Sequence, residues 1–254
     1  MIGTGPSAIQ FIPAIQPTVR HMTVFQRTAA WVVPRHDREV GAVTRRLFSA
    51  APVLQSLERL RIYLQREMLW VGFHNPALMR LPERRARTFL ETQVRDPELR
   101  ARLLPTYRFG CKRVLISDDY LRSIDQPNVA LVTDGIREIT EHGITDNTGT
   151  EHPLDVIIYG TGFQTAQLPL TDRTYGTDGR TLAEVWDGEP TAYLGTSVAG
   201  FPNCYLIHGP NFGLGHTSVI HMFESQANYI AAAVTYARDH VLAAVEPTPT
   251  AQQT

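Results

Sequence analysis

The chain has 254 residues, a formal net charge of −1 and a hydrophobic content of 43%, which predict a folded protein of one large or two small domains. The balanced charge argues against a nucleic-acid partner. The two cysteines are far apart, and no secretory signal or bilayer-spanning apolar run is present, so we expect a cytoplasmic protein without a disulfide framework, for which membrane contact is not expected.

The first ten residues, MIGTGPSAIQ, predict a dinucleotide-binding turn. Gly3, Gly5 and Ala8 occupy the small positions of the G-x-G-x-x-G/A pattern, which provide a tight turn, close approach to a pyrophosphate and helix–sheet packing. A helix that begins near Pro6 or Ser7 would direct its free N–H groups at the phosphates. We therefore assign cofactor binding to Gly3, Thr4, Gly5, Ser7 and Ala8. Because only two residues precede the turn, we expect a chain truncated at its N-terminus.

The next residues complete a βαβ-like unit. Apolar residues recur at helical spacing from Ala8 to Ile15, and Met22–Gln26 is a second predicted strand. Arg27 and Thr28 follow this strand, where an NAD site usually has Asp or Glu. A guanidinium at this position suits a 2′-phosphate, which favours NADP. The alternative is that Arg27 is a solvated surface charge.

Residues 43–104 are rich in Arg and poor in Gly, and apolar residues recur there at helical spacing. This pattern predicts a helical insertion. Its basic, aromatic-bearing stretch, Arg59–Phe73, could touch a membrane surface. We favour the alternative that this helix packs on its own domain.

Strand patterns return after Cys111. The predicted strands are 113–116, 128–132, 136–144, 155–159 and 203–207, with turns at Asp134-Gly135 and Asn147–Gly149. A glycine-rich segment, His208–His216, then precedes a long helix from Thr217 or Ser218 to His240, which makes it a second candidate cofactor surface. Residues 246–254, rich in Pro, Thr and Gln, predict a flexible tail.

Other chemistries lack support in the sequence. His216 and His221 accompany no H-E-x-x-H motif or cysteine cluster, so we predict no metal site. Asp118 and Asp119 are adjacent and are better explained as a turn or a helix cap.

Six short segments form an ordered set along the chain: GTGPSAIQ (3–10), VFQRT (24–28), FGCKR (109–113), DVIIYGTGF (155–163), AYLG (192–195) and GPNFGLGH (209–216). In this order they resemble the class B flavin monooxygenases, the group that holds Baeyer–Villiger and N-hydroxylating enzymes. Lys112-Arg113 and the strand after them look most like the Baeyer–Villiger branch. The resemblance covers roughly the C-terminal half of a family member, because an earlier FAD-binding turn and the Baeyer–Villiger signature are absent.

The resemblance implies an enzyme that uses FAD and NADPH to insert one oxygen of O₂ into a ketone or to oxidise a soft heteroatom. It implies that Arg27, Thr28 and Lys112 hold the NADP 2′-phosphate. It implies that Arg113 is the catalytic arginine, since it would stabilise negative charge near the flavin and nicotinamide. The flavin ring would be lined by Asn211, Gly213 and the helix after His216, and Gly162 is assigned to cofactor binding in the preceding glycine turn.

We therefore predict an α/β fold: a Rossmann-like NADP-binding domain (1–42 and 105–160), a helical insertion (43–104) and the C-terminal part of an FAD-binding domain (161–245). The expected partners are a small-molecule substrate and either a separate N-terminal FAD-binding half or a second copy of the chain. Two alternatives remain open: an inactive remnant or NADP-binding module, and a disulfide-reductase-like flavoenzyme. The lack of a closely spaced cysteine pair argues against the latter.

Overall fold

The structure, a computed structural model, describes residues 1–253 except 38, 76, 164–169 and 214–217. It divides into two compact units, Met1–Gly162 and Phe163–Thr254. Each unit has its own hydrophobic core.

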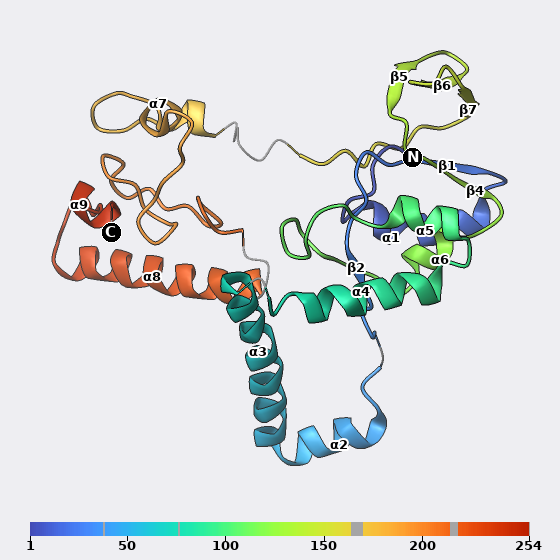
Figure 1. The fold of residues 1–254 in the computed structure, drawn as a ribbon. Coiled ribbons are helices and arrows are strands. Elements are labelled where there is room, and N and C mark those ends of the chain that lie inside the picture. The colour runs from blue at the N-terminus through green and yellow to red at the C-terminus, as the bar shows by residue number, and fades with distance from the viewer. Residues whose placement is uncertain (38, 76, 164–169, 214–217, 254) are drawn as a thin grey trace. The chain divides into compact units, whose positions relative to one another are not determined.

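A parallel arrangement of extended segments organises the first unit (Figure 1). Strand β1 (Met22–Phe25) pairs in parallel with β4 (Val129–Val132), with Met22 opposite Val129. Ile2 forms parallel bridges to both Phe25 and Tyr159. The resulting order, β4, β1, Ile2, Tyr159, has all segments running in one direction, as a dinucleotide-binding fold requires.

Helix α1 (Ala8–Ile15) and helix α6 (Tyr120–Ile124) pack into the core beside this sheet. Ala8, Ile12, Val24 and Ile124 are almost fully buried there. Pro13 is accommodated within α1, and a 3₁₀ turn (Gln16–Thr18) follows the helix. The helical spacing of the apolar residues therefore predicted the buried face correctly.

The insertion is helical, as predicted. It comprises α2 (Ala42–Ala50), α3 (Pro52–His74), α4 (Arg80–Gln93) and α5 (Pro97–Leu103). Helices α4 and α5 bury Leu90 and Leu103 in the core. Helix α3 contacts its own unit at its C-terminal end, where Gly72 lies against Met79. Along the rest of its length it does not pack as we expected, because its apolar side chains are exposed within the described part of the chain: Val53, Leu57, Leu60, Leu64, Met68 and Val71.

Four predicted strands differ in the structure. The segment 136–144 is not one strand, because a turn after residue 139 divides it between two antiparallel strands. The segment 113–116 is shortened to β3 (Leu115–Ile116), which pairs in parallel with β2 (Val32–Val33). The segments 155–159 and 203–207 form only isolated bridges, at Tyr159 and Tyr205. Val156 is 70% exposed, so the apolar run at 155–159 is not the buried strand that its composition indicated.

A small antiparallel sheet is formed by β5 (Ile136–Ile139), β6 (Gly143–Asp146) and β7 (Glu151–Pro153). Asp146 ends β6 with a buried side chain that organises the next turn. Its Oδ1 accepts hydrogen bonds from the amides of Thr148 and Thr150 at 2.9 and 3.0 Å, and its Oδ2 lies 2.9 Å from His152 Nε2. Hydrogen bonds from the Thr148 hydroxyl and from His152 hold the pKa of Asp146 far below its usual range.

We expect Asp146→Ala to lower the melting temperature by several degrees at neutral pH. A carboxylate with a depressed pKa in the folded state stabilises the fold above its unfolded pKa, and this stabilisation is lost as the pH falls through the folded value. The difference in melting temperature between wild type and variant should therefore be largest near pH 7 and should shrink in acid below about pH 4. Thermal unfolding followed by circular dichroism across this range tests it. Asp155→Ala, at an exposed position, is the control, and a difference that grows in acid would contradict the assignment.

The second unit contains a 3₁₀ turn (Thr171–Arg173) and three helices in its described part: α7 (Leu182–Trp186), α8 (Val219–Asp239) and α9 (Pro249–Gln252). Leu182, Trp186, Val198 and Phe201 form its core. A capping box between Thr181 and Glu184 starts α7. Helix α8 matches the long helix predicted from the sequence.

Residues 246–253 differ from the flexible tail that we predicted for 246–254. They contain α9, which Thr248 caps through a hydrogen bond to the Ala251 amide. Gln252 Oε1 accepts the Ala199 amide at 2.7 Å, and Glu246 Oε2 accepts the Gly200 amide at 2.7 Å. These side-chain contacts, which composition does not indicate, tie the segment to the 199–200 turn.

Within the residues that the structure describes, no helix has the length and apolar character needed to cross a membrane. The same residues contain no group of three or more His, Cys, Asp or Glu side chains arranged to hold a metal ion.

Candidate functional site

The glycine turn at residues 3–8 is held tightly against the Gly160 turn. Gly3 has a φ of +100°, and its amide donates to the Phe25 carbonyl at 3.0 Å. A Cβ at this position would lie 2.4 Å from the Gly160 carbonyl oxygen. Gly3 is therefore required by the backbone itself, both for its conformation and for its close approach. Ala8 is fully buried, as the third small position demands.

Gly5 differs from Gly3 in its surroundings. A Cβ at Gly5 would have no heavy atom within 4 Å, so the fold alone does not require glycine there. Thr4 is buried, whereas Ser7 is exposed at the N-terminus of α1 and its side chain makes no capping hydrogen bond. The open space at Gly5 lies where the fingerprint brings a pyrophosphate to the helix N-terminus.

Arg27 and Thr28 follow β1 at the same edge of the parallel arrangement. Because Ile2 bridges Phe25 in parallel, the segments that come after them, Gly3–Ser7 and Arg27–Thr28, lie at neighbouring carboxyl ends. Both Arg27 and Thr28 are exposed. Gly162 follows the bridge at Tyr159 at this edge, with a φ of +91° and open space around its Cβ position.

Pairing of β2 with β3 brings Lys112 and Arg113 toward the segment after β1. The Leu115 amide donates to the Trp31 carbonyl at 2.8 Å, so the residues before β3 lie beside those before β2. Trp31 Nε1 donates to the Tyr107 carbonyl at 2.9 Å, and Lys112 Nζ lies 4.9 Å from the centre of the Tyr107 ring. No local pattern in the sequence indicates this connection through Trp31 and Tyr107. Lys112 and Arg113 are both exposed.

Asp118 has a structural role. Its carboxylate accepts the amides of Arg35, His36 and Asp37 at 2.8, 3.2 and 3.2 Å. Asp119 is at the N-cap position of α6 without a side-chain capping bond. Both observations agree with a turn or helix-end role for this pair.

The second candidate surface, in the second unit, includes Asn211 and Gly213. Asn211 has a φ of +63°, and a Cβ at Gly213 would meet no heavy atom within 4 Å. His216 lies outside the described residues. The structure therefore describes only part of the glycine-rich segment that the sequence singled out.

Gln226 of α8 organises the loops next to this segment, a role that we did not predict from the sequence. Its buried amide nitrogen donates to the Gly195 carbonyl at 3.0 Å and to the Leu206 carbonyl at 3.2 Å, and its Oε1 accepts the His208 amide at 3.0 Å. Among the described residues, Tyr205 forms a bridge to Ser197. The Gln226 side chain thus holds the loop before Ser197 and the loop after Tyr205. A lone glutamine on an amphipathic helix carries no signal that distinguishes such a position.

Comparison with known proteins gives close matches along almost the whole chain. The chain is 42% identical over 248 residues to a Baeyer-Villiger monooxygenase of Pseudomonas aeruginosa, covering 97% of this chain and 47% of that protein. It is 44% identical over 232 residues to a Baeyer-Villiger monooxygenase of Streptomyces coelicolor, covering 91% and 45%. No protein-family model matches the chain.

Solved structures agree with these sequence matches. The closed crystal structure of cyclohexanone monooxygenase aligns with a TM-score of 0.83 and 28% identity, over 99% of this chain and 55% of that one. A crystal structure of OTEMO in complex with FAD and NADP aligns with a TM-score of 0.83 and 26% identity, over 99% and 54%. This agreement confirms the predicted α/β fold class.

The chain spans about half the length of the curated relatives that it matches. The ordered motifs, the parallel topology around the glycine turn and both sets of comparisons lead to one assignment. The chain is similar in sequence and in fold to the class B flavin monooxygenases of the Baeyer–Villiger type.

Proposed function

We propose that this chain supplies the NADPH-binding fold and the active-site arginine of an FAD-dependent monooxygenase. The overall reaction would consume a ketone, O₂, NADPH and a proton and yield an ester, NADP⁺ and water. Oxidation of a soft heteroatom would use O₂ and NADPH in the same way, with the heteroatom in place of the ketone as the acceptor of the oxygen atom. This activity is proposed for an assembled enzyme, because the chain spans about half of its relatives.

The observation that carries this proposal is the contrast between Gly3 and Gly5. Gly3 is required by the backbone, whereas Gly5 faces open space at the N-terminus of α1. That space, with Arg27 at the neighbouring strand end, suits a pyrophosphate and the 2′-phosphate of NADP. Lys112, positioned by the β2–β3 pairing, would add a second cation for this phosphate.

The fit to FAD is partial in the described residues. Asn211 and Gly213 would contact the flavin ring, and the open space at Gly213 suits close approach of a flat group. The FAD pyrophosphate would bind outside residues 1–254, because the glycine turn at residues 3–8 is assigned to NADP. FAD, when bound, supplies the chemistry that activates O₂.

Arg113 would place a fixed positive charge where oxygen acquires negative charge. A guanidinium stays protonated at any working pH, so this charge does not depend on a proton equilibrium. A preorganised charge of this kind stabilises developing negative charge without the reorganisation that water requires. Lys112, in contact with the Tyr107 ring, would hold the nicotinamide nucleotide instead.

We expect Arg27→Ala to weaken NADPH binding by about tenfold or more and to leave NADH binding nearly unchanged, because a charge-assisted contact to phosphate is worth roughly 1.5–3 kcal/mol. Binding of each nucleotide to the purified chain, measured by titration calorimetry, tests the prediction. Arg20→Ala, at the start of the segment before β1, is a control that should bind both nucleotides normally. Equal losses for NADPH and NADH would contradict the 2′-phosphate assignment.

A further inference from the structure

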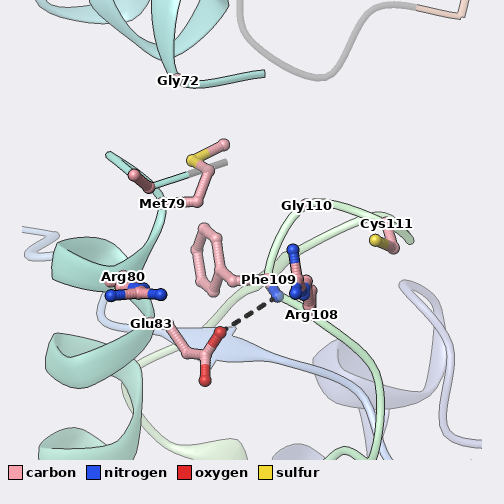
Figure 2. A pocket seen from close by; sticks show the side chains of 9 residues that line it. Gly72, Met79, Arg80, Glu83, Arg108, Phe109, Gly110 and Cys111 are labelled. Atoms are coloured by element: carbon pink, nitrogen blue, oxygen red, sulfur yellow. Dashed lines mark hydrogen bonds between the residues drawn. The ribbon is translucent and has the colours of Figure 1, made fainter. Parts of the chain in front are cut away.

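A cavity of about 490 Å³ lies in the first unit, away from the glycine turn in sequence (Figure 2). Its walls come from the end of α3, the start of α4 and the loop before Lys112. A volume of this size accommodates a small organic molecule. Neither the nucleotide nor the arginine assignment above makes use of it.

One part of the cavity is apolar. Met79 and Phe109 are 8% and 9% exposed, and both line it. Gly72 lies so close to Met79 that a Cβ there would be 2.9 Å from the Met79 sulfur. Figure 2 shows Met79 and the Phe109 ring close to one another in this wall. An apolar body of a ligand would therefore exchange water for thioether and aromatic surface.

The other part of the cavity is positively charged. Arg80, from α4, and Arg108, from the loop, lie on either side of Phe109 (Figure 2). The carboxylate of Glu83 also lines the cavity, but both of its oxygens already have partners. Its Oε1 accepts a hydrogen bond from Arg87 Nη2 at 3.1 Å, and its Oε2 accepts one from the Phe109 amide at 3.5 Å. Among the described residues, the Arg80 and Arg108 side chains have no hydrogen-bond or ion-pair partner.

This combination selects the chemical class of the ligand. Two guanidinium groups favour an acidic head that can accept paired hydrogen bonds. Glu83 lines the same cavity and would repel a doubly charged head more strongly than a singly charged one. A carboxylate meets both conditions, and an apolar body of moderate length suits the Met79–Phe109 wall.

We propose that this cavity binds a small carboxylate with an apolar body, its head at Arg80 and Arg108 and its body against Met79 and Phe109. Cys111 lines the cavity two residues before Arg113. This step rests on the proposed function. Because of this position beside the proposed catalytic arginine in the sequence, the substrates of the assembled enzyme would be ketones that also carry a carboxylate. The carboxylate would then fix the orientation of the substrate at a distance from the reacting carbonyl.

Binding of octanoate to the purified 254-residue chain tests this proposal without any cofactor. Ligand-observed NMR titration should show octanoate binding at least about tenfold more tightly than 1-octanol or octylamine, which share its apolar chain but lack the negative charge. Cys111 provides a second, local measurement because its thiol is exposed and lines the cavity. Octanoate should slow alkylation of Cys111 by iodoacetamide and leave alkylation of Cys204 unchanged.

Arg80→Gln and Arg108→Gln should each weaken octanoate binding by roughly threefold to tenfold, since both side chains are exposed and partly screened. Arg85→Gln, an exposed position on the same helix outside the cavity lining, is the matched control and should bind octanoate normally. Unchanged Cys204 reactivity and circular dichroism show that each variant is folded.

Equal binding of octanoate and 1-octanol, or unchanged octanoate binding in both cavity variants, would overturn the proposal. So would binding that leaves Cys111 alkylation unaffected. These outcomes are separate from a failure of the proposed function, which NADPH binding and the Arg27 variant test independently.

Discussion

Arg113→Ala is expected to lower formation of oxygenated product by about 10²- to 10³-fold, the loss found when a preorganised group for developing negative charge is removed. Because the chain spans about half of its relatives, the measurement uses this chain joined to the flavin-binding remainder of a related monooxygenase. NADPH oxidation should continue to some degree, since hydride transfer precedes the step at which Arg113 acts. NADPH consumption and product are followed together, so that consumption without product identifies the defect.

Two variants accompany this experiment. Arg113→Lys keeps a positive charge but not the planar guanidinium, and it should recover part of the product. Arg122→Ala removes an exposed arginine that binds Gln93 on the surface, and it should be as active as the parent. Product formed at the parent rate by Arg113→Ala would show that Arg113 is not the catalytic arginine. NADPH binding without any product from the parent enzyme would instead favour an NADP-binding module.

Gly3→Ala is expected to destabilise the first unit by roughly 2–5 kcal/mol, from backbone strain at positive φ together with overpacking. The new Cβ would lie 2.4 Å from the Gly160 carbonyl oxygen, which belongs to backbone and cannot move aside as a side chain does. Urea unfolding of the purified chain, followed by circular dichroism, measures this loss. A Gly3→Ala variant as stable as the parent would contradict the turn geometry.

Gly5→Ala separates the cofactor role of the turn from its structural role. A Cβ at Gly5 meets no heavy atom within 4 Å, so stability should change little. NADPH affinity should still fall, by about tenfold, because a methyl group would occupy the space through which a pyrophosphate approaches the backbone. Calorimetric titration with NADPH tests this, and unchanged affinity would contradict the assignment of the turn to NADP.

Local patterns in the sequence determined the elements whose partners lie within a few residues. The glycine turn, α1, β1 and the long helix α8 were all predicted, because turn geometry and helical spacing are properties of neighbouring residues. The resemblance to Baeyer–Villiger monooxygenases was also predicted, since six short motifs in a fixed order are a property of the sequence alone. The roles of Arg27, Lys112 and Arg113 stay predictions that the variants above test.

Tertiary structure decided the features that depend on a distant partner. The apolar run 155–159 has strand composition, but only Tyr159 forms a bridge and Val156 is exposed, because pairing depends on what lies beside it. The β2–β3 pairing brings Lys112 toward the Arg27 segment, and Gln226 joins loops on both sides of Tyr205. Such contacts link residues far apart in the chain, and no local pattern records them, because hydrogen bonds and burial are set by the assembled fold.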